Sequence, residues 1–319
     1  MNSYEKIVPY QEVIAAQQVI SGKVHRTPVV RSSYLGNLTH TKLYLKLELF
    51  QKTGSFKPRG VLNKLHHLDS ENRKKGVISI SAGNHAQALA WVATQLDIAS
   101  TIVMPSGSLR SKIEATQSYG GEVILTEDNL LETCLEVQKE RNLTLIHPFD
   151  DPKIIAGQGT IGIEILEDLP EVDVVIVGIG GGGLISGIAM ALKEQKPEIK
   201  VIGIEPEGAS AMSQSLQRGE PVHLDRVDTI ADGLSAPFAG EYTLAHVQAY
   251  VDDIVIVSDQ EIVEAMKLIL ERCKVTAEPA AASTLAPLLT SKVSIAQGAQ
   301  VLCVLSGGNI DQKSLKALL

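Results

Sequence analysis

The stretch VVIVGIGGGGLISGIAMAL, residues 174–192, decides the class of fold. It is free of charge, and about 18 such residues in a row usually indicate a membrane-spanning helix. However, six of its residues are glycine and four of these are consecutive. A helix facing lipid with that run would be poorly formed. We therefore expect a buried strand, a glycine turn and a buried helix of a water-soluble protein.

Strands and helices alternate on both sides of this stretch. Amphipathic segments such as 85–96 and 128–142 place alanine and leucine at helical spacing. The strand-like, β-branched runs are 77–81, 101–105, 122–126 and 143–148, followed by 173–178, 200–205, 253–257 and 301–306. This alternation predicts an α/β fold of two open, mainly parallel twisted sheets with helices on both faces, and the chain crosses between them near 150–153.

Composition excludes several classes of function. The 319 residues carry a net charge of −8, which gives no counterion-release drive toward nucleic acid, and aromatic residues make up only 4 %. The three cysteines, Cys134, Cys273 and Cys303, form no CxxC pair and are typical of reduced thiols. The N-terminal residues lack the apolar core of a signal peptide. We expect a cytoplasmic protein with no nucleic-acid or membrane partner.

A lysine stands beside the start of a helix in Gly54-Ser55-Phe56-Lys57-Pro58-Arg59-Gly60. Proline is favoured at the first helical position, so Lys57 lies at or next to the N-cap. The positive end of the helix dipole disfavours its ammonium, which lowers the pKa and makes a better amine nucleophile. A solvated surface lysine before a helix would give the same pattern.

A second motif, Ser81-Ala82-Gly83-Asn84-His85, follows the run 77–81 and opens a helix. Backbone N–H groups at a helix N-terminus bind anions such as a substrate carboxylate, and the Asn84 amide adds a donor and an acceptor. Ordinary capping by Asn84 is the competing interpretation.

The third motif is the glycine loop Gly178-Ile179-Gly180-Gly181-Gly182-Gly183-Leu184, between a strand and a helix. Such a loop turns its amides inward around a phosphate. It also satisfies GxGxxG, and Glu205 at the end of the next strand has the place of a ribose-binding acid. A dehydrogenase that binds NAD is therefore an alternative, although it leaves Lys57 and Asn84 unexplained.

The fourth motif is Ser306-Gly307-Gly308-Asn309, directly after the run 301–306. Ligands of open α/β sheets bind beyond the carboxyl ends of the strands, so the four motifs are expected to converge on one cleft. A capping serine in a tight turn is the simpler interpretation of this motif alone. Together, an amine nucleophile, a phosphate cradle, a carboxylate site and a hydroxyl for a ring nitrogen fit pyridoxal 5'-phosphate and an amino-acid substrate.

In this order the four motifs resemble the pyridoxal-phosphate enzymes of the tryptophan-synthase β-like fold, within them the threonine/serine dehydratase and serine racemase family. The resemblance extends from His25-Arg26-Thr27-Pro28 to Asn309 and includes 46–48, 147–151, 157–160 and Glu278-Pro279. It implies that Lys57 forms the Schiff base and takes the α-proton. The implied cofactor-binding residues are Phe56, Lys57, Asn84, Gly180, Gly181, Gly182, Gly183, Leu184 and Ser306, and the implied substrate-binding residues are Ser81, Ala82, Gly83, Asn84 and His85.

Two departures favour the dehydratase branch. Racemases resemble this chain but carry a serine where Ala82 stands, and a methyl group cannot deliver a proton to the opposite face of the substrate. Phe149 is likewise typical of dehydratases. Some relatives bind a metal through Glu205, the Ala209 carbonyl and an acid two residues on, but here that position is Ala211, so we expect no metal.

The resemblance implies a threonine/serine ammonia-lyase that acts by β-elimination and leans toward amino-acid catabolism. Racemisation of serine, or dehydration of 3-hydroxyaspartate, stays open as an alternative on the same cofactor. The resemblance also implies a homodimer. It further implies a large cofactor-binding domain formed by 1–52 and 149–319, a small mobile domain formed by 53–148, and the cofactor in the cleft between them.

Overall fold

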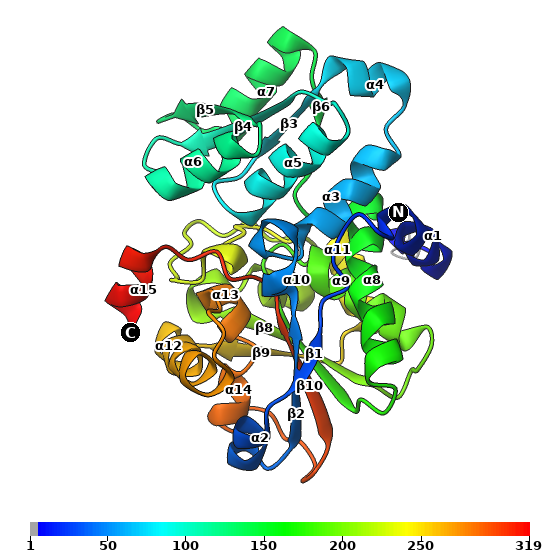
Figure 1. The fold of residues 1–319 in the computed structure, drawn as a ribbon, viewed down its shortest axis with the longest axis vertical. Helices are drawn as coiled ribbons and strands as arrows, with labels where there is room; N and C mark the ends of the chain where they lie inside the picture. The colour runs from blue at the N-terminus through cyan, green and yellow to red at the C-terminus, as the bar shows by residue number, and fades with distance from the viewer. Residues whose placement is uncertain (1–5) are drawn as a thin grey trace.

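The computed structural model describes residues 6–319, which form two open β-sheets, one above the other (Figure 1). The larger sheet has six strands and the smaller sheet has four. The larger contains β1 (Val29–Arg31), β2 (Lys42–Leu47), β7 (Val174–Gly178), β8 (Lys200–Pro206), β9 (Asp253–Val257) and β10 (Gln300–Leu305), and the smaller contains β3 (Val77–Ile80), β4 (Ser100–Pro105), β5 (Glu122–Thr126) and β6 (Thr144–Leu145). The stretch that opened the sequence analysis is thus a buried strand, a turn and a helix.

Helices surround both sheets. They are α1 (Tyr10–Ile20), α2 (Ser33–Thr39), α3 (Lys57–His66), α4 (Ser70–Lys75), α5 (Asn84–Gln95), α6 (Arg110–Ser118), α7 (Leu130–Arg141), α8 (Pro152–Asp168), α9 (Gly183–Lys193), α10 (Ala211–Arg218), α11 (Glu241–Tyr250), α12 (Asp259–Leu268), α13 (Pro279–Ala282), α14 (Ala286–Leu289) and α15 (Gln312–Leu318), with short turns η2 (Glu48–Phe50), η3 (Lys52–Gly54), η4 (Glu207–Ala209), η5 (Asp232–Leu234) and η6 (Ile269–Cys273). Among the helices of residues 6–319, none has the length and apolar character needed to cross a membrane.

The larger sheet takes its middle strand from the far end of the chain. Its order is β1-β2-β10-β7-β8-β9, and every neighbouring pair is parallel except β1 with β2. Cys303 of β10 lies opposite Leu45 of β2 on one side and Ile176 of β7 on the other. The two ends of the chain are therefore joined in one sheet.

Successive residues of β10 face opposite cores, as the pleat of a strand requires. Cys303 and Leu305 lie in a core that includes residues of α12, α13 and α14. Leu302 and Val304 lie in a second core with residues of α8, α9 and α11. Both faces of the sheet are covered, which confirms the predicted fold class and explains why β7 and β10 are apolar without alternation.

The smaller sheet is parallel throughout, in the order β5-β4-β3-β6. Val77 and Ile102 are buried against α5 and α3 on one face. Ile78 and Val103 contact Cys134 of α7 on the other face. Parallel strands buried on both sides give continuous apolar runs, and this is why these strands were visible in the sequence.

Helices α3 and α8 lie in the segments of chain that connect the two sheets (Figure 1). The Asp151 carboxylate caps α8 by accepting hydrogen bonds from the N–H groups of Lys153 and Ile154, with Pro152 in the first turn. A Cβ added at Gly157 of α8 would lie 2.6 Å from both the carbonyl oxygen of Arg59 and the Cα of Gly60 in α3. The backbones of the two helices therefore touch, and only a residue without a side chain fits there.

All eight predicted strand runs contain a strand, but the run 143–148 shortens to β6, which ends at Leu145. The reason is the turn that follows, in which Nδ1 of His147 accepts the N–H of Asp150 at 2.8 Å. The sequence analysis did not predict β1 or β2. Charged residues interrupt the apolar pattern of β2, yet Lys46 there is completely buried because other residues neutralise it.

Candidate functional site

The first and fourth motifs are joined backbone to backbone. Ser55 and Gly307 form an isolated antiparallel bridge. The N–H of Phe56 donates to the carbonyl oxygen of Ser306, and the N–H of Gly308 donates to the carbonyl oxygen of Gly54, each at 3.0 Å. The end of β10 therefore fixes the turn that leads into α3. Ser306 is buried, and its backbone contact with Phe56 brings the fourth motif next to the first.

Asn84 brings the second motif to the same place. Its Nδ2 donates to Oε1 of Glu278 and its Oδ1 accepts from Nδ2 of Asn309, both at 2.7 Å. Asn309 Nδ2 also donates to the carbonyl oxygen of Thr53 at 2.7 Å. The cap of α5 is Gly83 instead of Asn84, so the side chain of Asn84 does not perform the capping that competed as an interpretation.

Glu278 is a member of the site to which the sequence analysis assigned no role. It is buried, its Oε2 accepts the N–H of Asn309 at 3.2 Å, and a Cβ at Gly307 would lie 2.6 Å from its Oε1. Burial raises the pKa of Glu278 to about 7, against the opposing effect of the Asn84 hydrogen bond. Its signal in the sequence was a carboxylate directly before the proline that opens α13.

The Lys57 amine faces this site from the first residue of α3. Its Nζ lies 3.0 Å from the carbonyl oxygen of Pro148 and 5.2 Å from the centre of the Phe56 ring. Burial lowers the pKa of Lys57 to about 8, and the Glu278 carboxylate acts in the opposite direction. The pKa of Lys57 is therefore lowered, as the sequence analysis expected. The main cause is burial, whereas the sequence analysis named the helix dipole.

The glycine loop lies next to Phe149, one residue from the carbonyl that Lys57 contacts. Gly182 caps α9 in the left-handed conformation at φ +91°. A Cβ at Gly181 would come within 2.4 Å of the Phe149 ring, and one at Gly183 within 2.9 Å of the Phe149 carbonyl oxygen. The third motif is therefore packed against the segment that holds the Lys57 amine.

The amides of this loop are free to bind an anion. Within the described chain, no hydrogen bond outside the regular helices and strands has the N–H of Gly181, Gly182, Gly183 or Leu184 as its donor. These N–H groups lie in the first turn of α9 and in the loop before it, where the helix dipole favours negative charge. Together with the amine of Lys57, they fit a cofactor that carries a phosphate and a carbonyl.

The loop Ser81–Gly83 follows β3, and its own contacts are local. The N–H of Gly83 donates to Oγ of Ser81 at 3.1 Å, and Ala82 packs against the core between α3 and α5. The ring of His85 is buried, with Nε2 3.0 Å from Oγ of Ser79. Burial holds the pKa of His85 well below its usual value, helped by the charge of Lys57, so the ring is neutral.

Glu205 has a structural role in this fold. Its Oε1 accepts the N–H of Met212 at 2.8 Å and its Oε2 accepts the N–H of Ser213 at 2.9 Å, at the start of α10. Because these donors occupy the carboxylate, it is not placed to bind a ribose as the NAD alternative requires. In residues 6–319 no cluster of His, Cys, Asp or Glu side chains has the arrangement of a metal site.

One protein family and several curated proteins are similar to this chain over most of its length. A family model described as pyridoxal-phosphate dependent enzyme matches residues 20–307. The L-threonine ammonia-lyase of Thermotoga maritima is 44% identical over 98% of this chain and 78% of its own length. The catabolic L-threonine dehydratase TdcB of Escherichia coli is 42% identical over 97% of this chain and 95% of its own.

Solved structures of proteins with two different activities, a racemase and a deaminase, are similar to this chain. Maize serine racemase gives a TM-score of 0.92 at 40% identity, covering 97% of this chain and 96% of the racemase. A processed threonine deaminase from Solanum lycopersicum gives a TM-score of 0.90 at 34% identity, covering 99% of this chain and 92% of the deaminase. The fold is therefore shared by both activities, and individual residues must distinguish them.

Proposed function

The chain belongs to the family of pyridoxal-phosphate dependent enzymes, and on this premise we propose that it removes the β-hydroxyl group of L-threonine and L-serine as water. The released enamine then takes up one water and hydrolyses. The products are a 2-oxo acid and ammonia. Relatives named for this activity are 42–44% identical over nearly the whole chain. The observation that carries the proposal is the convergence of Lys57, Asn84, the glycine loop and Ser306 in one place.

We propose a role for each of these residues toward the cofactor. Gly180, Gly181, Gly182, Gly183 and Leu184 would bind the phosphate with their N–H groups, which the structure leaves free in the loop and the first helical turn. Asn84 would hydrogen-bond the phenolic oxygen, and Phe56 would pack beside the ring. When bound, pyridoxal phosphate supplies an electron-withdrawing ring that makes the proton on the substrate α-carbon removable.

Lys57 is the proposed base. Its Nζ would take the proton from the α-carbon of the substrate, which requires a neutral amine. Burial lowers the pKa of Lys57 to about 8, so the neutral form is far more accessible near neutral pH than for an exposed lysine. In the protein without cofactor, Nζ donates a hydrogen bond of 3.0 Å to the Pro148 carbonyl.

Ser306 would meet the ring nitrogen of the cofactor with a neutral hydroxyl. A hydroxyl does not keep that nitrogen protonated as a carboxylate would, and this limits the withdrawal of electrons into the ring. A weaker electron sink suits loss of a β-hydroxyl over a long-lived carbanion. Ser81, Ala82, Gly83, Asn84 and His85 would hold the substrate carboxylate at the start of α5, where backbone N–H groups and the helix dipole favour an anion.

We also propose two units that close on each other. The strands of the larger sheet lie within 29–47 and 174–305, and those of the smaller sheet within 77–145. This distribution supports a large unit from both chain ends and a smaller unit that excludes water when it closes. The backbone of α3 contacts α8 at Gly60, whereas Val61 and Leu62 pack in the core of the smaller sheet. We therefore propose that the start of α3 stays with the large unit and that the moving part begins within α3, later than residue 53.

Cytoplasmic location and a homodimer complete the proposal. The three cysteines are free thiols, as in proteins of reducing compartments. Val30, Tyr34, Leu38 and Phe50 are exposed on β1, α2 and η2, and such apolar surface supports self-association. Light scattering on the purified protein would give twice the mass of 34.2 kDa for a dimer.

The test of the function is a pair of proteins assayed with added cofactor. The wild type should form 2-oxobutyrate from L-threonine and pyruvate from L-serine, whereas Lys57→Ala should form neither while its far-ultraviolet circular dichroism stays native. Substantial turnover by Lys57→Ala would exclude the mechanism.

Serine racemisation is the second candidate, because a serine racemase shares the fold. The methyl group of Ala82 cannot deliver a proton, so we expect pyruvate without D-serine in one reaction with L-serine. Ala82→Ser should add D-serine to the products. Appreciable D-serine from the wild type would mean that another group supplies the opposite-face proton.

A further inference from the structure

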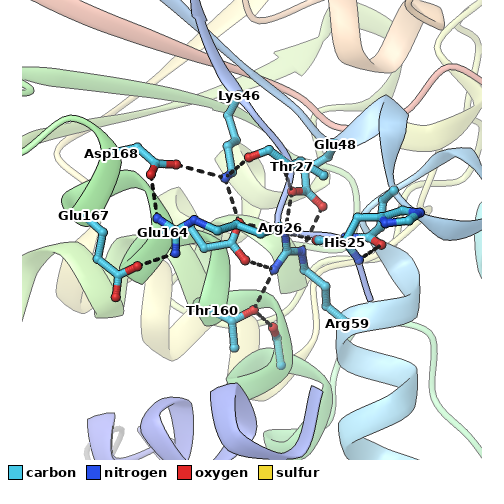
Figure 2. A network of polar contacts seen from close by, with 12 residues as sticks. His25, Arg26, Thr27, Lys46, Glu48, Arg59, Thr160, Glu164, Glu167 and Asp168 are labelled. Atoms are coloured by element: carbon cyan, nitrogen blue, oxygen red, sulfur yellow. Dashed lines mark hydrogen bonds and ion pairs between the residues drawn. The ribbon is translucent and has the colours of Figure 1, made fainter. Parts of the chain in front are cut away.

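A buried network of charges surrounds Arg59, two residues after Lys57 in the first turn of α3 (Figure 2). Arg59 is completely buried. Its guanidinium binds two carboxylates at once. Nε and Nη2 donate to Oε2 and Oε1 of Glu48 at 2.9 and 2.8 Å, and Nη1 and Nη2 donate to Oε1 and Oε2 of Glu164 at 2.7 and 2.9 Å.

At its buried centre the network pairs two cations with two carboxylates, and at its rim Lys46 also lies 3.8 Å from Oδ2 of Asp168. Lys46 donates to Oε2 of Glu164 and to the carbonyl oxygen of Thr27, both at 2.7 Å. The Thr27 hydroxyl donates to Oε1 of Glu48. Two cations, Arg59 and Lys46, thus face two carboxylates, and all four side chains are buried. Burial of separate charges would be very costly, so the four groups are held as one unit.

The partners of Arg59 come from the large unit. Glu48 lies in η2, Lys46 in β2 beside the central strand β10, and Glu164 in α8. Each carboxylate binds a different edge of the planar guanidinium through two hydrogen bonds. Such paired hydrogen bonds fix the orientation of the guanidinium as well as its distance from the carboxylates. The first turn of α3 is therefore held from two sides, where the backbone of α3 also touches α8 at Gly60 and Gly157.

A buried ion network contributes little net stability compared with an apolar core of the same shape, but it fixes geometry. The geometry fixed here is that of the turn that begins with Lys57. We propose that Arg59 is a positioning residue that sets the place of the Lys57 amine relative to the cofactor and the substrate α-carbon. This inference rests on the proposed function of Lys57.

The test replaces the guanidinium of Arg59 with a group of the same charge. In Arg59→Lys a single ammonium cannot satisfy both carboxylates in the same geometry. A displacement of the Lys57 amine of about 1 Å is expected to lower kcat about 100-fold. KM should change by less than about threefold, because the carboxylate-binding loop lies in the other unit. The matched control is Arg26→Lys, at the rim of the same network, where Arg26 pairs with Glu167 and Asp168 in partial contact with solvent.

A second readout follows the lysine without turnover. Apoprotein is mixed with pyridoxal phosphate, and the fraction fixed covalently by borohydride is measured against time and mapped to Lys57 by peptide analysis. Arg59→Lys should capture the cofactor at least tenfold more slowly than the wild type, and Arg26→Lys at the wild-type rate. The visible circular dichroism of the bound cofactor should change in Arg59→Lys alone.

If Arg59→Lys does not fold, Glu48→Asp takes its place, because it keeps the charge and withdraws one carboxylate by a single methylene group. It should show the same pattern, a lower kcat and slower capture with KM kept. Wild-type kcat and capture rate per folded molecule would overturn the inference, as would a loss explained entirely by a lower folded fraction. Activity in Lys57→Ala would instead overturn the proposed function, so the two failures are distinguishable.

Discussion

Nδ2 of Asn84 donates a 2.7 Å hydrogen bond to Oε1 of Glu278, and this bond connects the start of α5, which packs on the smaller sheet, to the start of α13, which packs on the larger one. Because Glu278 is buried and its pKa is raised to about 7, the carboxylate changes its protonation state close to physiological pH. This contact between helices of the two sheets is therefore coupled to pH.

The first prediction concerns this carboxyl in the apoprotein. Its folded pKa of about 7 lies above the ordinary value of 4.5, so the folded state binds the proton more tightly than the unfolded chain. Stability should therefore fall as pH rises from about 4.5 to 7 and stay level above 7, by on the order of 3 kcal/mol. Glu278→Gln should lose this dependence. Urea unfolding between pH 5 and 8 measures it, with the exposed Glu136→Gln as control; identical profiles for wild type and Glu278→Gln would contradict the prediction.

The second prediction uses the buried amine. The folded pKa of Lys57 is about 8, below the ordinary value of 10.5, so below pH 8 the folded apoprotein is destabilised by its buried ammonium. Lys57→Met should be more stable than wild type at pH 7 by on the order of 1–2 kcal/mol. The advantage should shrink as pH rises from 8 to 10.5. Thermal melts of apoproteins at pH 7, 9 and 10 measure this, and a constant difference across that range would exclude it.

The third prediction concerns the space around the glycine loop. A methyl group at Gly181 would lie 2.4 Å from the Phe149 ring, which is itself enclosed by His147 and Phe238 at centroid distances of 4.6 and 5.3 Å. Gly181→Ala should therefore cost about 1–3 kcal/mol of stability and weaken cofactor binding. Denaturant unfolding and fluorescence titration with pyridoxal phosphate test both effects.

Two further variants serve as controls for Gly181→Ala. A Cβ at Gly107 meets no atom within 4 Å, so Gly107→Ala should be neutral. Adding Phe149→Leu to Gly181→Ala should restore part of the stability, because the smaller side chain makes room. If the double variant is no better than the single one, crowding by Phe149 is not the cause.

The fourth prediction tests the charge balance of the Arg59 network. Glu164→Gln removes one of the two buried carboxylates and leaves Arg59 and Lys46 with Glu48 and the partly exposed Asp168, which should cost about 3–5 kcal/mol. Adding Lys46→Met restores neutrality, so the double variant should be much more stable than Glu164→Gln alone. A double-mutant cycle by urea unfolding gives the coupling energy. Additive losses would show that the charges act independently.

The sequence predicted eight of the ten strands of residues 6–319, whether buried like β7 or partly exposed like β5 and β9. β5 and β9 have the bounds that were expected, because β-branched runs between turn residues indicate such strands. β2 was missed, since Lys46 interrupts the apolar pattern, and its burial depends on Glu164, which lies more than 100 residues away in the chain. Local pattern carries no information on that partner.

For the site, too, a local sequence pattern does not show which distant residues become partners. Lys57, the glycine loop and Ser306 stood out because lysine beside a helix start and repeated glycine are unusual locally. Glu278 did not, because its significance arises from Asn84 and Asn309, which tertiary folding brings to it. The lowered pKa of Lys57 was expected from the helix start, but burial, which no single segment determines, is its main cause.

The place of β10 between β2 and β7 has a consequence for how the protein is made. The ribosome completes β2 at Leu47 and reaches β10 at Gln300, about 250 residues later. At a translation rate of ~5–20 residues per second, the edge of β2 that pairs with β10 stays without its partner for on the order of 12–50 s. The strands of the smaller sheet, by contrast, all lie within 77–145 and are synthesised early. During that interval the nascent chain exposes an apolar strand edge of the kind that recruits other chains. Slow translation or a shortage of chaperones should thus lower the yield of this enzyme more than its final stability would suggest.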